Sequence, residues 1–532
     1  MLVGANAISA ICNDFLNIED SILTSRSSNV EWFKTYGGDR FEMLQCVQTT
    51  SDNGYVACGV KSAYDIENPE EEWLRPWVIK TNSNGDLEWE WTTYGFEYES
   101  RFFSAYLEVY CMFVEETMDG GFITGFRIYG QSDGDYWISA IVKLNGNGEE
   151  EWINFCMDAL EWNFGPHSIL ELNDGSFVLA GFSGTTEIDD MEDFACLYKI
   201  DSNGNEQWRK EYNYGEADSL WALCKTSDGG YLITGWADYF DYWMIKTDSN
   251  ANEEWNKTFG GDSNDFAHAR NCYQTADGGY IMAGYSFSFG NGECDTWIVK
   301  TDSMGNMDWN RTYGDKRRDV CWSFAQANTN SYVFCVCYNF NYVFDGKADI
   351  HLVNIDDKGY INWIQEFGGA GYQIGQHIYK TSDGGFIVSG RTERYGNEAS
   401  DGLLVKFGEF NNERPNKPYT PSGRKRGQPG TEYTFTTTAT DPDGDSLQYM
   451  WDWGDGNFSY WLDTNEATYT WTTENNFKIR VKAMDIYGGE SEWSDPLAFS
   501  TPKNKSFNTP FLQFLENHQH LYPLLRQIFG LQ

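Results

Sequence analysis

The chain has few basic residues and few histidines. Its 532 residues contain 38 lysines and arginines against 80 aspartates and glutamates, so the formal net charge is −42. Nucleic-acid binding relies on cations that neutralise phosphates, so this balance argues against a nucleic-acid partner and, for the same reason, against anionic membranes. The six histidines form no i, i+4 helical pair, and no G-x-S-x-G or P-loop string occurs. The sequence therefore gives no sign of those enzyme classes.

Long apolar runs are also missing. No segment of eighteen or more apolar residues occurs, so we expect no transmembrane span. The apolar start, MLVGANAISAI, lacks a basic segment. We interpret residues 1–27 as the remnant of a secretory signal, with an ordinary disordered leader as the alternative.

Cysteines are present but lack metal-binding spacing. None of the twelve cysteines belongs to a C-x-x-C pair, which argues against a zinc site. Cys46, Cys224 and Cys272 stand at near-equivalent places in their repeat units, which favours small buried side chains over a disulfide framework. An isolated disulfide, for example one that involves Cys294, stays open.

What the sequence has in abundance is repetition. An Asp-Gly-Gly turn or a variant of it recurs about every fifty-five residues, followed by an aromatic residue at Tyr55, Phe122, Phe177, Tyr231, Tyr280, Tyr332 and Phe386. A second pattern places a tryptophan at Trp89, Trp152, Trp208, Trp255, Trp309 and Trp363, with a relative, Trp32, ahead of the first turn. The seventh unit ends near residue 408 without its tryptophan segment. The beginning of the chain therefore provides what the end lacks.

The repeat unit has the pattern of strands. Its runs of four to eight residues are rich in Tyr, Val, Ile, Thr and Trp, and Gly, Asp and Asn clusters bound them. The DGG and NG steps suit hairpin turns, because glycine and asparagine accept positive φ. Four antiparallel strands in each of seven units predict an all-β fold, a seven-bladed β-propeller over residues 28–409 closed by its N-terminal strand.

Residues that recur with the repeat are expected to form the core. The periodic tryptophans pack one blade on the next. His167, His268 and His377 fall in the first, innermost strands of their units, but their offsets from the turns differ, which argues against a shared metal site. The 80 carboxylates are too many for a glycosidase pair to be identified by spacing.

The composition changes near residue 410. Residues 410–430 are rich in proline and contain a basic cluster, Arg424, Lys425 and Arg426, which indicates a linker. Short alternating strands follow over residues 431–502 and suit an immunoglobulin-like sandwich. The strings TATDPDGDSLQYMWDWGDG and FKIRVKAMDIYGGESEWSDP resemble the PKD domain, whose hallmark is a WDFGDG-like motif. The propeller units are similar to repeats of secreted archaeal and bacterial surface proteins that often carry a PKD module.

The resemblance implies a location and an architecture more than a chemistry. PKD domains are non-catalytic spacers or adhesion modules, and some bind calcium through an acidic loop. Asp441, Asp443 and Asp445 match such a loop, with Asp485 as a fourth ligand, and carboxylates at alternate positions suit a hard cation. The alternative is a turn in which the aspartates cap backbone N–H groups.

The last segment, residues 503–532, has apolar residues at helical spacing split by Pro523. It resembles a C-terminal tail of archaeal surface proteins. We interpret it as an amphipathic tail that engages an export or anchoring system, or as a helix docked on the sandwich or on a neighbouring molecule.

The variable loops predict where the protein binds. Loops between the second and third strands and between blades emerge on one face of the propeller, and loops on a rigid scaffold commonly bind ligands. The candidate residues are Tyr64, Trp73, Tyr98, Tyr239, Phe240, Asp262, Asp265, Arg317, Arg318 and Tyr395. We therefore expect a secreted or cell-surface, non-enzymatic binding or adhesion protein whose partner is a surface glycan or protein. The alternatives are a carbohydrate-active enzyme at the channel mouth and a structural surface-layer component.

Overall fold

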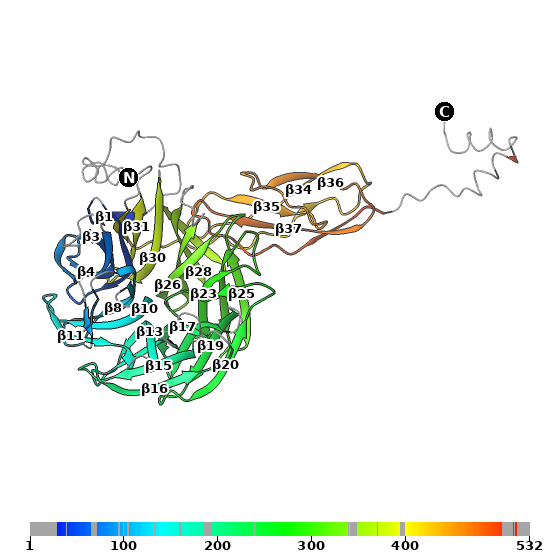
Figure 1. Cartoon of the computed structure of the whole chain (residues 1–532). Helices are drawn as coiled ribbons and strands as arrows, with labels where there is room; N and C mark the ends of the chain where they lie inside the picture. Colours follow the sequence, from blue (N-terminus) through cyan, green and yellow to red (C-terminus); the bar gives the residue numbers. More distant parts are fainter. Residues whose placement is uncertain are drawn as a thin grey trace. The chain divides into compact units, whose positions relative to one another are not determined.

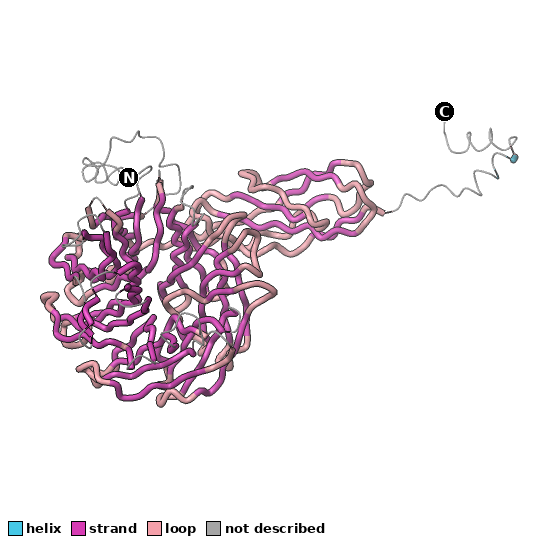
Figure 2. Tube along the Cα trace, in the orientation of Figure 1, coloured by secondary structure: helices cyan, strands magenta, loops and turns pink. Residues whose placement is uncertain are grey.

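The protein is described by a computed structural model, and the 38 elements found within its described residues are β-strands. Figures 1 and 2 show how they are arranged. The structure describes residues 29–502 except 39, 65–71, 94–95, 99–100, 104–105, 132–134, 159–161, 185–193, 216–217, 238–240, 339, 341–347, 370 and 394–399, together with 514, 517 and 518. The signal interpretation of residues 1–27 lies outside the described residues. Of the predicted helical tail, residues 503–532, the structure describes Phe514, Asn517 and His518, and the first two are helical. The rest of this prediction lies outside the described residues. Contacts divide the chain into two units, Met1–Asn412 and Glu413–Gln532.

Within the described residues the first unit contains seven antiparallel sheets of four or five strands, one for each repeat, and the first six are built in chain order. The first three comprise β2 (Glu42–Thr49), β3 (Tyr55–Tyr64), β4 (Glu72–Thr81) and β5 (Leu87–Thr92); β8 (Tyr106–Glu116), β9 (Phe122–Gln131), β10 (Asp135–Leu144) and β11 (Glu150–Phe155); and β12 (Met157–Asp158), β13 (Trp162–Glu171), β14 (Phe177–Gly184), β15 (Phe194–Ile200) and β16 (Glu206–Tyr212). A separate hairpin joins β6 (Phe96–Tyr98) to β7 (Arg101–Phe103).

The other four sheets follow the same order. They comprise β17 (Ser219–Lys225), β18 (Tyr231–Ala237), β19 (Asp241–Thr247) and β20 (Glu253–Phe259); β21 (Asp265–Phe266), β22 (Tyr273–Gln274), β23 (Tyr280–Ser286), β24 (Asp295–Thr301) and β25 (Met307–Tyr313); β26 (Val320–Asn328), β27 (Ser331–Tyr338), β28 (Asp349–Asp356) and β29 (Ile361–Phe367); and β30 (Tyr372–Lys380), β31 (Phe386–Glu393), β32 (Ser400–Phe407) and β1 (Val30–Tyr36).

The predicted pairing of the N-terminal strand with the last unit is found. β1 runs antiparallel to β32, with Trp32 opposite Lys406 and Tyr36 opposite Gly402, so the seventh sheet is completed by the start of the chain (Figure 1). Each sheet also contacts the next, and β2 of the first sheet contacts β30, β31 and β32 of the seventh. A hydrophobic cluster lies at each of these junctions. The core of the unit therefore lies between successive sheets.

The periodic tryptophans pack between sheets, against turns that only small residues can form. Gly148 has a φ of +79°, and a Cβ there would lie 2.6 Å from Trp89, the tryptophan of the preceding sheet. Ala251 stands at the corresponding place in the fourth unit with a φ of 59°. The repeated Asn-Gly turn thus provides a residue with a left-handed backbone conformation and a surface without a bulky side chain, against which the indole packs.

The repeated turn aspartate has a second partner that the sequence did not reveal. In the fourth sheet Asp228 accepts a hydrogen bond from the N–H of Gly230 (3.0 Å) and forms an ion pair with Lys246 (2.7 Å). The Lys246 side chain is only 2% exposed and also pairs with Glu254 at 2.8 Å. The same trio recurs at Lys80, Lys143, Lys300 and Lys406.

The second unit is a sandwich of two three-stranded sheets. They comprise β33 (Ser422–Gly423), β34 (Glu432–Thr436) and β36 (Glu466–Thr470), and β35 (Gln448–Asp452), β37 (Asn476–Met484) and β38 (Leu497–Ser500). Trp451, Trp453 and Trp471 lie in the core between them, each no more than 3% exposed. Two tryptophans of the WDWGDG motif are therefore structural.

Candidate functional site

The predicted acidic loop lies between β34 and β35. Asp441 Oδ1 accepts hydrogen bonds from the N–H groups of Asp443 (2.9 Å) and Asp445 (3.2 Å), which bends the chain so that the carboxylates converge. One oxygen from each of these aspartates lies within 4.8 Å of the other two. The loop borders an open cavity of about 640 Å³, also lined by Tyr449 and Asp463.

The three carboxylates fit a divalent cation. The Oδ2 atoms of Asp441 and Asp445 are buried and have no hydrogen-bond partner among the described residues. Burial, together with the charges of Asp441 and Asp443, raises the pKa of Asp445. Buried carboxylate oxygens without donors, close to like charges, are destabilising unless a cation binds. Calcium prefers such oxygen ligands, so these three residues would hold it.

Asp485, the expected fourth ligand, does not belong to this group. Its carboxylate accepts hydrogen bonds from the N–H groups of Tyr487 and Gly489, each at 2.8 Å, and so caps its own turn. The turn-capping alternative therefore describes Asp485, whereas Asp441 combines a capping oxygen with an unpartnered one.

A second feature of this unit is an aromatic face on the sheet β35–β37–β38, defined by Phe458, Trp461 and Trp493 with Arg480 and Lys482. Phe458 is 57% exposed, and its ring centroid lies 6.1 Å from that of Trp493. The Lys482 ammonium lies 5.4 Å from the Trp461 ring and 5.5 Å from the Trp493 ring, and the Arg480 guanidinium lies 5.3 Å from Trp493. Cations and rings thus alternate across the face.

Strand alternation places these groups on one side. Phe477, Ile479, Val481 and Ala483 of β37 are buried in the core, so Arg480 and Lys482 point outward. The segment that carries Phe458 and Trp461 runs beside β35, where Tyr449 and Leu462 exchange backbone hydrogen bonds of 2.8 and 3.0 Å. Tyr460 in this segment is 91% exposed.

The charges of the aromatic face are compensated within it. Arg480 pairs with Asp452 at 2.5 Å, and Lys482 pairs with Glu490. The face therefore presents flat rings beside fixed, paired polar groups. Sequence reasoning missed it because the rings come from two separate loops, although aromatics inside the polar strings NFSYWLD and ESEWSD were a signal.

The candidate residues of the first unit that the structure describes lie on several elements. Tyr64 and Trp73 lie in β3 and β4, opposite Glu72 and Ala63, and Tyr98 lies in β6. Asp262 and Arg317 are exposed, and Arg318 forms an ion pair with Glu293 at 3.0 Å. Tyr239, Phe240 and Tyr395 lie outside the described residues.

Asp265 has an internal role. It is fully buried, its Oδ2 accepts a hydrogen bond from the N–H of Gly261 (2.8 Å), and its Oδ1 accepts one from the Ser286 hydroxyl. The carboxylate thus fixes its own loop, which leaves it without access to a ligand.

Two of the three inner histidines contact backbone carbonyl groups of a neighbouring sheet. His167 Nδ1 lies 2.8 Å from the Leu220 carbonyl, and His377 Nδ1 lies 3.0 Å from the Val47 carbonyl. Burial, with a smaller effect of the Arg270 charge, lowers the pKa of His167, His268 and His377 to about 3 in each case. Within the described residues, no group suited to a metal ion includes a histidine.

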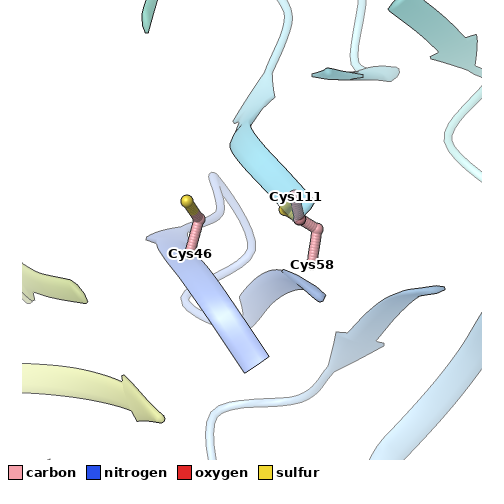
Figure 3. A group of neighbouring side chains, drawn as sticks. All are labelled: Cys46, Cys58 and Cys111. Carbon is pink, nitrogen blue, oxygen red and sulfur yellow. A yellow bond between two sulfur atoms is a disulfide. The ribbon is translucent and has the colours of Figure 1, made fainter. Parts of the chain in front are cut away.

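One group of cysteines meets near the junction of the first two sheets. The sulfur atoms of Cys46, Cys58 and Cys111 lie within 4.8 Å of one another, on β2, β3 and β8 (Figure 3). Cys58 and Cys111 form a disulfide, so the three cannot act together as thiolate ligands in this state. Cys46, Cys272 and Cys294 are free and buried, and Cys224 is free. The isolated disulfide thus joins neighbouring sheets and leaves Cys294 out.

Comparison with protein families identifies the second unit. The family model for the PKD domain matches residues 418–495, the region of the sandwich, the acidic loop and the aromatic face. Residues 418–495 are a PKD domain. This confirms the resemblance drawn from the WDWGDG string. No curated protein matches the chain.

Solved structures extend the comparison. The PKD domain of an M14-like peptidase from a Thermoplasmatales archaeon is 35% identical, with 18% of this chain covering 100% of that one at a TM-score of 0.16. The extracellular domain of a proposed hybrid two-component system from B. thetaiotaomicron is 10% identical, over 86% of this chain and 67% of that one, at a TM-score of 0.27. A glycosyl hydrolase from Bacteroides ovatus is 9% identical, over 59% and 88%, at a TM-score of 0.28.

No helix in the described part of the chain has the length and hydropathy needed to cross a bilayer.

Proposed function

We propose that the protein is an extracellular, non-enzymatic binding or adhesion protein, in which a seven-bladed β-propeller carries a glycan-binding PKD domain. The cyclic contacts of the seven sheets and the pairing of β1 with β32 support the propeller. The PKD domain supports the surface location. The acidic group Asp441, Asp443 and Asp445 supports a calcium ion that stiffens the PKD domain beside its cavity.

The aromatic face of the PKD domain carries the functional proposal. Soluble proteins expose large apolar side chains together mainly where they bind something. The rings offer stacking surfaces for the C–H faces of sugars, and the paired groups Arg480–Asp452 and Lys482–Glu490 offer donors and acceptors for hydroxyls. Because these charges are already compensated, the face suits an uncharged polysaccharide better than an ionic ligand.

A carbohydrate-active enzyme at the centre of the first unit is the alternative function. Glycoside hydrolysis commonly uses two carboxylates on either side of the scissile bond. The inner strands carry two carboxylates that interact, Glu115 on β8 and Glu171 on β13, and burial together with Glu171 raises the pKa of Glu115 to about 8. The aromatic and basic side chains that meet at the centre include His167, Trp221 and Arg270. The variable loops, with exposed Asp262 and Arg317, remain a second candidate surface.

A binding assay with the full chain tests the proposal. Glycan arrays and sedimentation with insoluble neutral polysaccharides should show binding that Phe458→Ala or Trp461→Ala weakens about threefold to tenfold. Tyr419→Ala is the matched control, because Tyr419 is an aromatic residue of the same unit, 72% exposed, and it lies beside the other sheet, where its N–H bonds to Thr438. Binding that is equal in all three variants would remove the aromatic face from the proposal.

A further inference from the structure

Each sheet of the first unit carries a distinctive residue in its innermost strand. The position lies ten residues before the aromatic residue of the turn and is occupied by Gln45, Met112, His167, Trp221, Arg270, Trp322 and Gln376. In six sheets the strand register shifts at this residue, so it forms a β-bulge. In the fifth sheet the strand is interrupted here, between β21 and β22. Bulges redirect side chains and are common next to functional sites.

These side chains meet across the unit. The His167 ring stacks on Trp221 with centroids 4.1 Å apart, and Trp221 lies 4.3 Å from His268. Arg270 Nη1 donates hydrogen bonds to the Met112 carbonyl (2.7 Å) and to Cys46 Sγ (2.8 Å). Arg270 belongs to the fifth sheet, whereas Met112 and Cys46 belong to the second and first. His167, Trp221 and Arg270 thus contact residues of other sheets at the centre of the unit.

Arg270 is the one charged residue among these seven. Its hydrogen-bond acceptors are neutral: two backbone carbonyls and the sulfur of Cys46. The ion pairs found within the described residues do not include Arg270, although the chain has 80 acidic residues. The buried lysines of the same unit, by contrast, each pair with acidic side chains, as Lys246 does with Asp228 and Glu254. The guanidinium thus brings uncompensated positive charge to the centre.

Two donors without acceptors belong to the sheets before and after that of Arg270. The indole N–H groups of Trp221, in the preceding sheet, and Trp322, in the following sheet, are buried and have no hydrogen-bond partner among the described residues. Buried donors in folded proteins nearly always find an acceptor. The two indole donors therefore lack an acceptor, and the acceptors of the Arg270 guanidinium are all neutral. A missing partner would accept hydrogen bonds from the indoles and complement the positive charge.

We propose that the centre of the first unit binds a small oxyanion, a carboxylate, phosphate or sulfate, held by Arg270 and by the indole N–H groups of Trp221 and Trp322. A guanidinium matches oxyanions with two parallel hydrogen bonds, and its charge strengthens them. The adjacent His268 stays neutral at physiological pH because burial and Arg270 hold its pKa near 3. Arg270 therefore provides the charge for the ligand without help from the imidazole.

Calorimetry on the full chain tests this site. Sodium phosphate, sulfate and malonate are titrated separately at constant ionic strength, with chloride as the background anion. At least one should give saturable heat with one site per chain. Arg270→Gln should weaken that binding at least about tenfold, and Trp322→Phe, which keeps the ring but removes the N–H, about threefold to tenfold.

Arg424→Gln is the matched control, since it removes an exposed arginine from the second unit and should leave the affinity unchanged. Saturable binding that Arg270→Gln leaves intact, or no saturable heat with any of the three anions, would overturn the proposal. If Arg270→Gln does not fold, crystals of the wild-type protein soaked in selenate give an independent answer. An anomalous selenium peak beside the Arg270 guanidinium supports the site, and a map without that peak contradicts it.

Discussion

Lys406 of the last sheet forms ion pairs with Asp383 of its own turn, at 2.9 Å, and with Glu31 of the first strand, at 3.3 Å. In the fourth sheet the two acids that hold the equivalent lysine, Lys246, belong to one repeat. In the seventh sheet they come from the two ends of the unit. Closure of the first unit therefore restores the side-chain trio of the repeat as well as its fourth strand.

Substitution of Lys406 should lower the free energy of unfolding much more than substitution of Glu31. The Lys406 side chain is 2% exposed, so Lys406→Ala loses packing and both ion pairs and should lower the free energy of unfolding by about 2–4 kcal/mol. Glu31 is 49% exposed, so Glu31→Gln should lower it by less than about 1 kcal/mol. Urea unfolding followed by tryptophan fluorescence measures both. Equal losses of unfolding free energy in the two variants would contradict the burial of Lys406 that the structure shows.

The packing of the periodic tryptophans against the glycine turns can be tested with two glycines of similar backbone conformation. Gly148 (φ +79°) would place a Cβ 2.6 Å from Trp89, whereas Gly120 (φ +80°) would place one in open space. Gly120→Ala should lower the free energy of unfolding by about 1–2 kcal/mol, because alanine disfavours the left-handed backbone conformation. Gly148→Ala should lower it by at least about 1 kcal/mol more, because the added Cβ also collides with Trp89. Thermal and urea unfolding compare them. If the two variants are equally stable, Trp89 does not constrain the turn.

The sequence predicted the parts of the structure that repeat. Four strands in each unit and the pairing of the Trp32 strand with the last unit follow from the spacing of turns and tryptophans, because a repeat with alternating apolar residues leaves few alternatives. The Asp441, Asp443 and Asp445 group follows from local spacing as well. The Cys58–Cys111 disulfide and the aromatic face do not, since each brings together segments that only strand pairing or sheet packing places side by side.

The bulge position shows why residue type alone is a weak guide. Gln45, Met112, His167, Trp221 and Arg270 share a place in the repeat but no chemistry, so no motif marks the centre. The three inner histidines at different offsets suggested separate roles. In the structure the His167 ring nevertheless stacks on Trp221, and the His268 ring lies 4.3 Å from Trp221 in a tilted arrangement. The fifth sheet interrupts its inner strand near His268.

The disulfide should stabilise the first unit. It closes a loop with a sequence separation of 53 residues, for which the chain-entropy model gives about 4 kcal/mol. Cys58→Ala together with Cys111→Ala should lower the unfolding free energy by about 2–4 kcal/mol, and reduction of the wild-type protein should have a similar effect. Cys46→Ala, which leaves the disulfide, is the control. Peptide mapping that finds Cys46 rather than Cys58 joined to Cys111 would contradict the pairing.

Stability should fall in mild acid because of the three inner histidines, His167, His268 and His377. Their pKa is about 3 in the folded state and about 6.5 when unfolded, so the unfolded chain binds more protons between these values. Stability is therefore complete above pH 6.5 and declines as the pH falls, by about 1.4 kcal/mol per pH unit for each histidine.

Urea unfolding at pH 7 and pH 4.5 measures this decline, and His377→Gln should reduce its slope by about a third. Glu115 acts in the opposite direction over part of this range, because burial and Glu171 raise its pKa to about 8. The comparison with His377→Gln isolates the histidine contribution, since both proteins retain Glu115. A slope that this substitution leaves unchanged would show that the imidazole is already protonated in the folded state.

Calcium should stabilise the PKD domain through Asp441, Asp443 and Asp445. Without the ion, Asp445 is protonated more readily than a free aspartate because burial and the neighbouring carboxylates raise its pKa, so stability should rise as the pH falls through its folded pKa. Added calcium should raise the melting temperature and abolish the rise of stability at lower pH, since the bound ion favours the carboxylate.

Asp445→Asn should remove the response to calcium and, by removing a like charge, make the calcium-free protein more stable. Asp485→Asn, outside the group, should keep the calcium response. A response lost equally in both variants, or absent from the wild type, would mean that the three aspartates serve the turn alone.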